Sequence, residues 1–228
     1  MFQKIFRSLQ KRGKKMESPA PSRNFQAMAD HAELFFGTDF VVMHEKASSV
    51  LHLDVYVIPP KENRPFWTLF TSGMSDLDLP IPDGLPFSAQ IELAICLPPH
   101  WPLTGSDPRW KLPEFFWPIA ELKSTAMYPH LCETWLGLGH SIEPADGALA
   151  GGRFAGHMLR QLTILPRGFD HLQSKDGRTI EILALCPLLP EEMAFKLNHS
   201  TEALENRLRD AGVTELLNPL RPSVCPAQ

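Results

Sequence analysis

The spacing of apolar residues predicts one helix followed by a series of strands in the first half of the chain. Residues 25–36 have apolar side chains at helical spacing between a candidate N-cap, Asn24, and a terminating Gly37. Residues 51–57 alternate apolar and polar side chains, which is typical of a strand with one buried and one polar face. Further strands are predicted at residues 40–45, 66–72 and 91–97.

The second half predicts a helix, two strands and two more helices. Pro118 is placed in the first turn of a helix, where its missing N–H has no cost, and Pro129 ends that helix. Because the chain contains 22 prolines, long helices are not expected. Residues 137–153 hold five glycines and are predicted as a loop. Strands at 154–165 and 179–186 flank an Asp-Gly hairpin turn at 175–178, and helices begin at Pro190 and after Ser200.

This order of elements predicts an α+β fold. The strands follow one another without regular βαβ alternation, which favours a largely antiparallel or mixed sheet flanked by helices. Residues 13–23 are rich in Gly, Pro, Ser and Lys and are typical of a linker. We therefore expect a basic N-terminal tail and linker over residues 1–23 and one domain over residues 24–228, large enough to bury a core without disulfides.

Charge is divided unevenly between the tail and the domain. The whole chain carries a formal charge of −4, and its first fifteen residues carry six basic and no acidic residues, so residues 16–228 carry −10. An acidic body argues against nucleic-acid binding and favours a basic partner. Apolar residues at helical spacing in residues 1–15 leave two readings of the tail open, a solvated basic segment or a helix that contacts a membrane surface.

The cysteines and the length of apolar runs bear on location. Cys96, Cys132, Cys186 and Cys225 lie far apart without CxxC spacing, so we expect reduced thiols and a cytoplasmic protein. No stretch approaches the roughly 20 apolar residues that span a bilayer.

The sequence carries no recognised catalytic or metal-binding motif. It lacks GxSxG, GxxxxGK[ST] and HExxH, and no two of its nine histidines have zinc-site spacing such as HxxxH. Neither a metal nor a cofactor is therefore predicted. Ser75, Asp76 and His140 could form a hydrolytic triad, but a tight turn explains the residues around Gly73 as well, and we expect no enzyme.

Five tryptophans crowd into residues 67–135 and are interleaved with prolines. They could line a groove that binds a peptide, or they could anchor loop segments on the body of the domain. The two readings are compatible, and both remain open at the level of sequence.

Five separated segments resemble the suppressor of fused family. They are TSGMSD (71–76), ELAICLPPHW (92–101), WPIAEL (117–122), WLGLGH (135–140) and ALCPLLPEEM (184–193). Their order and spacing also match, and the resemblance covers nearly all of residues 25–222. It implies an α+β fold, a non-catalytic protein-binding role and a bacterial single-domain member that resembles the N-terminal domain of the animal protein.

Bacterial members of that family are often encoded beside polymorphic toxins, so the resemblance implies an immunity protein that neutralises a cognate toxin by occlusion. The alternative is a regulatory adaptor that binds a partner peptide by strand addition or in a groove lined by tryptophan. In either case the expected partner is a protein, encoded nearby if it is a toxin. The candidate binding residues are Gly73, Met74, Ser75, Asp76, Trp101, Trp117, Pro118, Trp135, Gly139 and His140.

Overall fold

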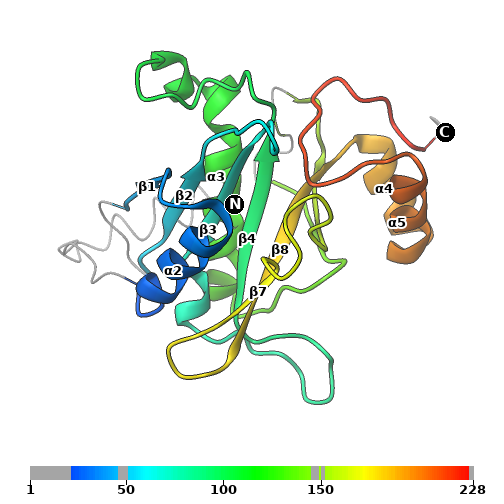
Figure 1. Ribbon diagram of the computed structural model, residues 1–228. Coiled ribbons are helices and arrows are strands. Elements are labelled where there is room, and N and C mark those ends of the chain that lie inside the picture. The colour runs from blue at the N-terminus through cyan, green and yellow to red at the C-terminus, as the bar shows by residue number, and fades with distance from the viewer. Residues whose placement is uncertain (1–21, 46–50, 145–148, 150–151, 226–228) are drawn as a thin grey trace, which may run out of the picture.

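The computed structural model describes residues 22–45, 51–144, 149 and 152–225. Residues 1–21 of the predicted tail, with the alternative membrane-surface helix, lie outside this part of the chain. One eight-stranded sheet runs through the described residues, and helices lie against both of its faces (Figure 1). The predicted α+β class with a mixed sheet is therefore confirmed.

The first four strands form an antiparallel meander in which each strand pairs with the next along the chain. β4 then pairs in parallel with β8, which brings the second half of the chain into the same sheet. β6 and β5 continue the sheet beyond β8, and β7 pairs with the first half of β8. The strands are β1 (Val41–Met43), β2 (Asp54–Ile58), β3 (Trp67–Ser72), β4 (Ile91–Leu97), β5 (Ser141–Ile142), β6 (Gly156–Arg160), β7 (His171–Gln173) and β8 (Thr179–Leu188).

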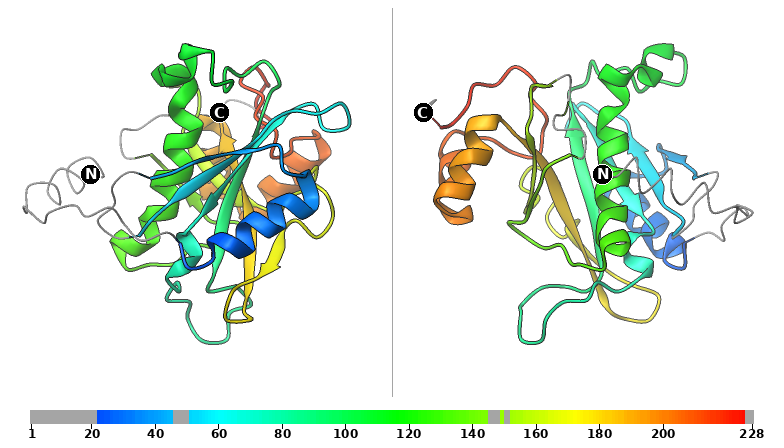
Figure 2. Two further views of the ribbon diagram at one scale, coloured as in Figure 1. Left: turned by 60° about the vertical axis from the view of Figure 1, so that its left-hand side comes forward. Right: turned by 180° about the vertical axis from the view of Figure 1, so that it is seen from behind.

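Two helices cover opposite faces of this sheet (Figure 2). α2 (Phe25–Phe36) buries Met28, Ala32 and Phe36, one every four residues, in a cluster that includes the stacked rings of Tyr56 and Phe70. α3 (Pro113–Cys132) packs on the other face. α4 (Pro190–Asn198) and α5 (Thr201–Asp210) follow β8 and pack on a smaller cluster formed with β6.

β2 differs from its prediction in where it starts and in the burial of both of its faces. The strand begins at Asp54 rather than at residue 51, and all five of its residues are buried. The face predicted to be polar includes Asp54 and Tyr56, and it is buried because α2 and its neighbours cover it. An alternating pattern therefore marks two different buried environments here, one apolar and one partly polar.

The prediction that proline prevents long helices was wrong for α3. This helix has 20 residues, begins at Pro113, and contains Pro118 and Pro129 in its interior. An interior proline costs about 3 kcal/mol. Leu122 and Ala126 are fully buried in the main core, and burial of the helix's apolar side chains offsets that cost.

The second half contains two strands that the sequence did not predict. β5 lies inside the predicted loop 137–153, and β7 lies just before the predicted hairpin turn. That turn is confirmed, since the amide of Ser174 bonds to the carbonyl of Arg178 at 2.7 Å between β7 and β8. β6 ends at Arg160, five residues before the predicted end of its strand.

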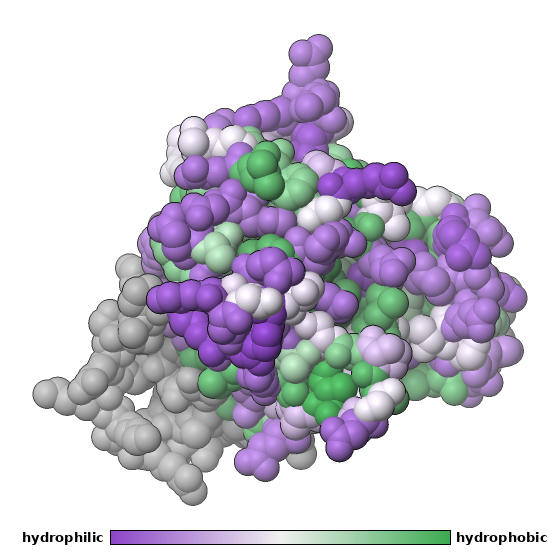
Figure 3. All heavy atoms as spheres, turned by 60° about the horizontal axis from the view of Figure 1, so that its bottom comes forward, coloured by the Kyte–Doolittle hydropathy of each residue, from purple (hydrophilic) through white to green (hydrophobic). Residues whose placement is uncertain are grey.

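All four cysteines lie within the described residues as free thiols. Among the described residues, no helix is both long enough and apolar enough to cross a membrane. At the end of the molecule shown in Figure 3, hydrophobic residues form small patches separated by polar ones.

Candidate functional site

The motif turn, residues 71–76, connects β3 to the short 3-10 helix η1 (Met74–Asp76). Gly73 has φ of +125°, which side-chain-bearing residues rarely adopt. A Cβ atom at this position would lie 1.9 Å from the backbone oxygen of His52. The turn therefore requires glycine for two reasons, its backbone angle and its close approach to the segment that precedes β2.

A buried carboxylate from β4 holds the motif turn in place. Glu92 is fully buried, and its Oε1 accepts hydrogen bonds from the amides of Gly73 and Ser75 at 2.9 and 3.0 Å. The hydroxyl groups of Ser75 and Thr71 donate to the same carboxylate at 2.7 and 2.6 Å. Burial raises the pKa of Glu92, and these four hydrogen bonds oppose that shift. Two segments that resemble the family, 71–76 and 92–101, are thus parts of one buried network.

The far end of the motif turn holds the start of α2. Asp76 accepts hydrogen bonds from the hydroxyl of Ser22 at 2.8 Å and from the amide of Arg23 at 3.0 Å. Asn24 is the N-cap residue by position, but its side chain forms no cap hydrogen bond. Its Nδ2 instead donates to Ser75 Oγ at 3.3 Å, and its Oδ1 accepts from the amide of Lys175 at 3.1 Å. One turn therefore joins β3, β4, α2 and the β7–β8 hairpin.

These contacts bear on the hydrolase alternative. Ser75 Oγ is bonded to Glu92 and Asn24, and Asp76 is bonded to residues of the α2 start. His140 lies instead against the ring of Trp135. Among the described residues, no hydrogen bond joins Ser75 or Asp76 to His140, so the three do not form a triad.

Two of the candidate tryptophans are buried and anchor segments around α3. Trp101 donates from Nε1 to the carbonyl of Phe115 at 3.0 Å and meets the ring of Phe115 edge-on. Trp117 packs against Phe154 with ring centroids 6.0 Å apart, and Pro118 beside it is also buried. Trp101 and Trp117 therefore fit the interpretation in which tryptophans anchor loop segments on the body of the domain.

The segment around Trp135 differs, because it combines aromatic rings with partial exposure. The aromatic patch consists of Phe87, Trp135 and His140, all half-buried. The ring centroid of Trp135 lies 4.3 Å from that of His140 and 5.1 Å from that of Phe87. Burial, together with the positive charge of Lys196, lowers the pKa of His140, which therefore presents a neutral imidazole at neutral pH.

Gly139 fixes the backbone beneath the aromatic patch. Its φ is +83°, and a Cβ atom would lie 2.7 Å from the methyl group of Thr201 at the start of α5. Its amide donates to the carbonyl of Leu159 in β6 at 2.8 Å. The patch is thus carried on a backbone that is attached to both β6 and α5.

A second buried carboxylate organises the C-terminal segment. Glu192 in α4 is fully buried and accepts from Arg221 Nη2 at 2.6 Å. It also accepts from the amides of Leu189 and Val224. The family-like segment 184–193 therefore holds the chain that follows α5.

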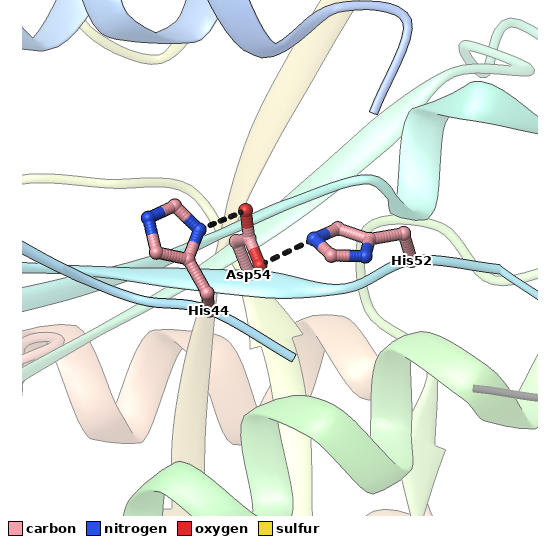
Figure 4. Close-up of side chains that lie close together, drawn as sticks. All are labelled: His44, His52 and Asp54. Atoms are coloured by element: carbon pink, nitrogen blue, oxygen red, sulfur yellow. Dashed lines mark hydrogen bonds and ion pairs between the residues drawn. The ribbon is translucent and has the colours of Figure 1, made fainter. Parts of the chain in front are cut away.

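The structure also brings together three potential metal ligands that the spacing rules missed. His44 follows β1, Asp54 begins β2, and His52 lies two residues before Asp54 (Figure 4). Their ligand atoms all lie within 4.8 Å of one another. The alternation of His52 and Asp54 in the sequence was a usable signal, because residues two apart in an extended segment share a face.

The fold and these contacts define an α+β domain in which most candidate residues hold turns and one group forms a half-exposed aromatic surface. The chain belongs to the suppressor of fused family, because the model of that family, described as Suppressor of fused protein (SUFU), matches residues 50–222. The resemblance seen in the sequence is thereby confirmed. A search of curated proteins found no match.

Solved structures show the same fold at low sequence identity. A putative SUFU homologue from Neisseria gonorrhoeae is 19% identical with a TM-score of 0.64, and the alignment covers 90% of this chain and 98% of that one. A chain from the Sufu–Fu complex is 15% identical with a TM-score of 0.61, covering 90% and 93%. Drosophila Suppressor of Fused is also 15% identical with a TM-score of 0.61, covering 90% of this chain but 52% of its own length.

Proposed function

We propose that this chain is a non-catalytic protein-binding module of the cytoplasm, and that it acts as an immunity protein that neutralises a cognate bacterial toxin by occlusion. Family membership supports the protein-binding part, since one relative of this fold was solved as the Sufu–Fu complex. The charge of −10 on residues 16–228 supports a basic partner, because complementary charge speeds association.

The half-exposed aromatic patch is the observation that carries this proposal. Of the candidate residues, Gly73, Met74, Ser75, Trp101, Trp117 and Pro118 are buried. We assign to them the shape of the domain rather than direct contact with a partner. Trp135 and His140 keep part of their surface exposed on a backbone held by β6 and α5. Large aromatic side chains on a rigid support are typical of the residues that dominate binding energy.

Co-expression with the product of the neighbouring gene tests this function. We expect the full chain to restore growth to cells that express the toxin and to form a complex measurable by calorimetry. Replacement of Trp135 by alanine should weaken the complex by about 30-fold or more, the effect of a central aromatic contact. Trp110→Ala is the matched control, because Trp110 is also half-buried but lies in the 3-10 helix η2 (Pro108–Lys111).

The outcomes separate the two parts of the proposal. A neighbouring product that is harmless and does not bind would refute the immunity role. A complex that tolerates Trp135→Ala and His140→Ala as well as it tolerates Trp110→Ala would place the contact elsewhere. Circular dichroism of each variant distinguishes lost binding from lost folding.

The position of β1 at the edge of the sheet supports the second candidate function, a peptide-binding adaptor that acts by strand addition. β1 is the outermost strand of the meander, and among the described residues it pairs with β2 alone. Its first residue, Val41, is 65% exposed. Val42→Pro, which removes an amide from β1, should weaken the binding of a partner peptide at this edge. Trp135→Ala should leave that binding unchanged.

A further inference from the structure

We propose that His44, His52 and Asp54 form a binding site for a divalent transition-metal ion. The site lies at the start of β2, on the face of the sheet that α2 covers. It is separate from the aromatic patch and does not depend on the proposed function. The chemical class follows from the ligands, because imidazole suits zinc, copper, iron and nickel, and a carboxylate adds negative charge.

The antiparallel register brings the three side chains together. Met43 pairs with Val55, so the next residue along β1, His44, comes opposite Asp54. His52 precedes Asp54 by two residues and lies on the same side of the extended chain. The amide of Glu45 donates to Asp54 Oδ1 at 2.9 Å, and this bond fixes the carboxylate relative to β1. The ligands therefore come from two backbone segments that the sheet holds in place.

The distances place each imidazole nitrogen beside one oxygen of the carboxylate. His44 Nδ1 lies 3.0 Å from Asp54 Oδ2, and His52 Nε2 lies 2.7 Å from Asp54 Oδ1. Metal–ligand bonds of about 2.0–2.2 Å place neighbouring ligand atoms roughly 3 Å apart. Figure 4 shows the carboxylate lying between the two imidazole rings, with one oxygen directed to each. Since the ligand atoms of the three groups lie within 4.8 Å of one another, a turn of both imidazoles toward a shared point in front of the carboxylate would let one cation contact both rings.

Burial of the three groups is graded from the interior to the surface. The side chain of Asp54 is 1% exposed, that of His52 is 10% exposed and that of His44 is 62% exposed. An ion can enter on the side of His44, and water can complete its coordination there. The buried carboxylate needs cationic or hydrogen-bonding partners in any case, and a metal ion would supply the strongest local charge.

Metal binding would change the tautomer of His52. Its Nδ1 is buried and forms no hydrogen bond within the described residues. No neighbour therefore holds the imidazole in the tautomer that carries its proton on Nε2, the nitrogen that faces Asp54. When Nε2 binds a metal ion, the proton moves to Nδ1, and this buried N–H needs an acceptor such as a water molecule or a side chain that turns toward it.

Calorimetry with Zn²⁺ alone tests the proposal on the full-length, untagged chain after removal of metal by a chelator. We expect one equivalent to bind at pH 7.5, and binding to weaken at pH 5.5 because protons compete for the imidazole nitrogens. His44→Ala and His52→Ala should each lower the affinity about tenfold or more. His100→Ala is the matched control, because His100 is exposed and lies at the opposite end of β4 from the motif turn.

Cobalt(II) distinguishes this site from binding at the exposed thiol of Cys132. A site of two imidazoles and a carboxylate gives ligand-field bands without the thiolate charge-transfer band that a cysteine ligand adds. Absence of stoichiometric binding by the parent chain would overturn the proposal. Retention of full affinity by His44→Ala would also overturn it, and this variant carries the test even if His52→Ala does not fold, because His44 is largely exposed.

Discussion

The buried carboxylate of Glu92 makes the strongest prediction about what holds the motif turn. Replacement by alanine removes the acceptor of two buried backbone amides, those of Gly73 and Ser75. Each buried donor left without a partner costs about 1–3 kcal/mol, so the two together cost about 2–6 kcal/mol. Since domains are stabilised by about 5–15 kcal/mol, we expect Glu92→Ala to fold poorly or not at all.

Glu92→Gln separates the role of the acceptor from the role of the charge. Glutamine keeps one carbonyl oxygen for the two amides, and the hydroxyl of Thr71 can rotate to accept from the new NH₂ group. We expect a loss of about 1–2 kcal/mol, because neutral hydrogen bonds replace charge-assisted ones while the cost of burying a charge disappears. The exposed Glu62→Ala should change stability by less than about 0.5 kcal/mol.

Equilibrium unfolding in urea, followed by tryptophan fluorescence, gives these free energies directly. Hydrogen exchange at the amides of Gly73 and Ser75 gives a local measure, and protection there should fall in Glu92→Ala before global unfolding. The reasoning is refuted if Glu92→Ala unfolds at the same urea concentration as Glu92→Gln, or if both amides stay protected without the carboxylate.

Three further predictions follow from named contacts. Gly73→Ala should abolish or severely reduce folding, because its Cβ would meet the backbone of His52, whereas Gly105→Ala, which meets nothing within 4 Å, should leave the thermal midpoint almost unchanged. Burial lowers the pKa of His157 to about 3, so the unfolded chain binds a proton that the folded chain does not, and stability should fall by about 2–3 kcal/mol from pH 7 to pH 4.5. His157→Gln should remove that part of the pH dependence in urea titrations. Arg221→Met leaves the carboxylate of Glu192 buried without its charged partner and should cost about 3–5 kcal/mol in the same assay, and a cost near zero would contradict the role of this pair.

Local rules predicted the elements whose sequence and environment agree. The bounds of α2 and β4 match their predictions, and β3 begins one residue late. These segments have a clear period and end at glycine or proline, so their local signals need no tertiary correction. α3 shows the opposite case, since its prolines signal an end while its apolar side chains are buried in the core on both sides of them.

The candidate site was predictable in its residues but not in its connections. The sequence indicates a turn at residues 71–76, and the structure has one. Nothing local indicates that Glu92, about twenty residues later, holds that turn, because such a contact is set by the pairing of β3 with β4. His44 and Asp54 likewise meet only through the register of β1 on β2. Motif rules based on linear spacing do not detect ligands that a sheet brings together.

Among the named strands of the described residues, only β4 and β8 pair in parallel, and this pairing has a consequence for how the chain reaches its native state. Ala94 and Ala184 are paired partners, so this contact closes a loop of 90 residues, whereas Phe70 and Ala94 in the meander are 24 residues apart. The entropy of closing the longer loop is greater by about 1 kcal/mol. During synthesis the meander can assemble while later residues are still being added, but its last strand keeps one unpaired, apolar edge until residues 179–188 have left the ribosome. Over that interval the chain is most exposed to association with other nascent chains.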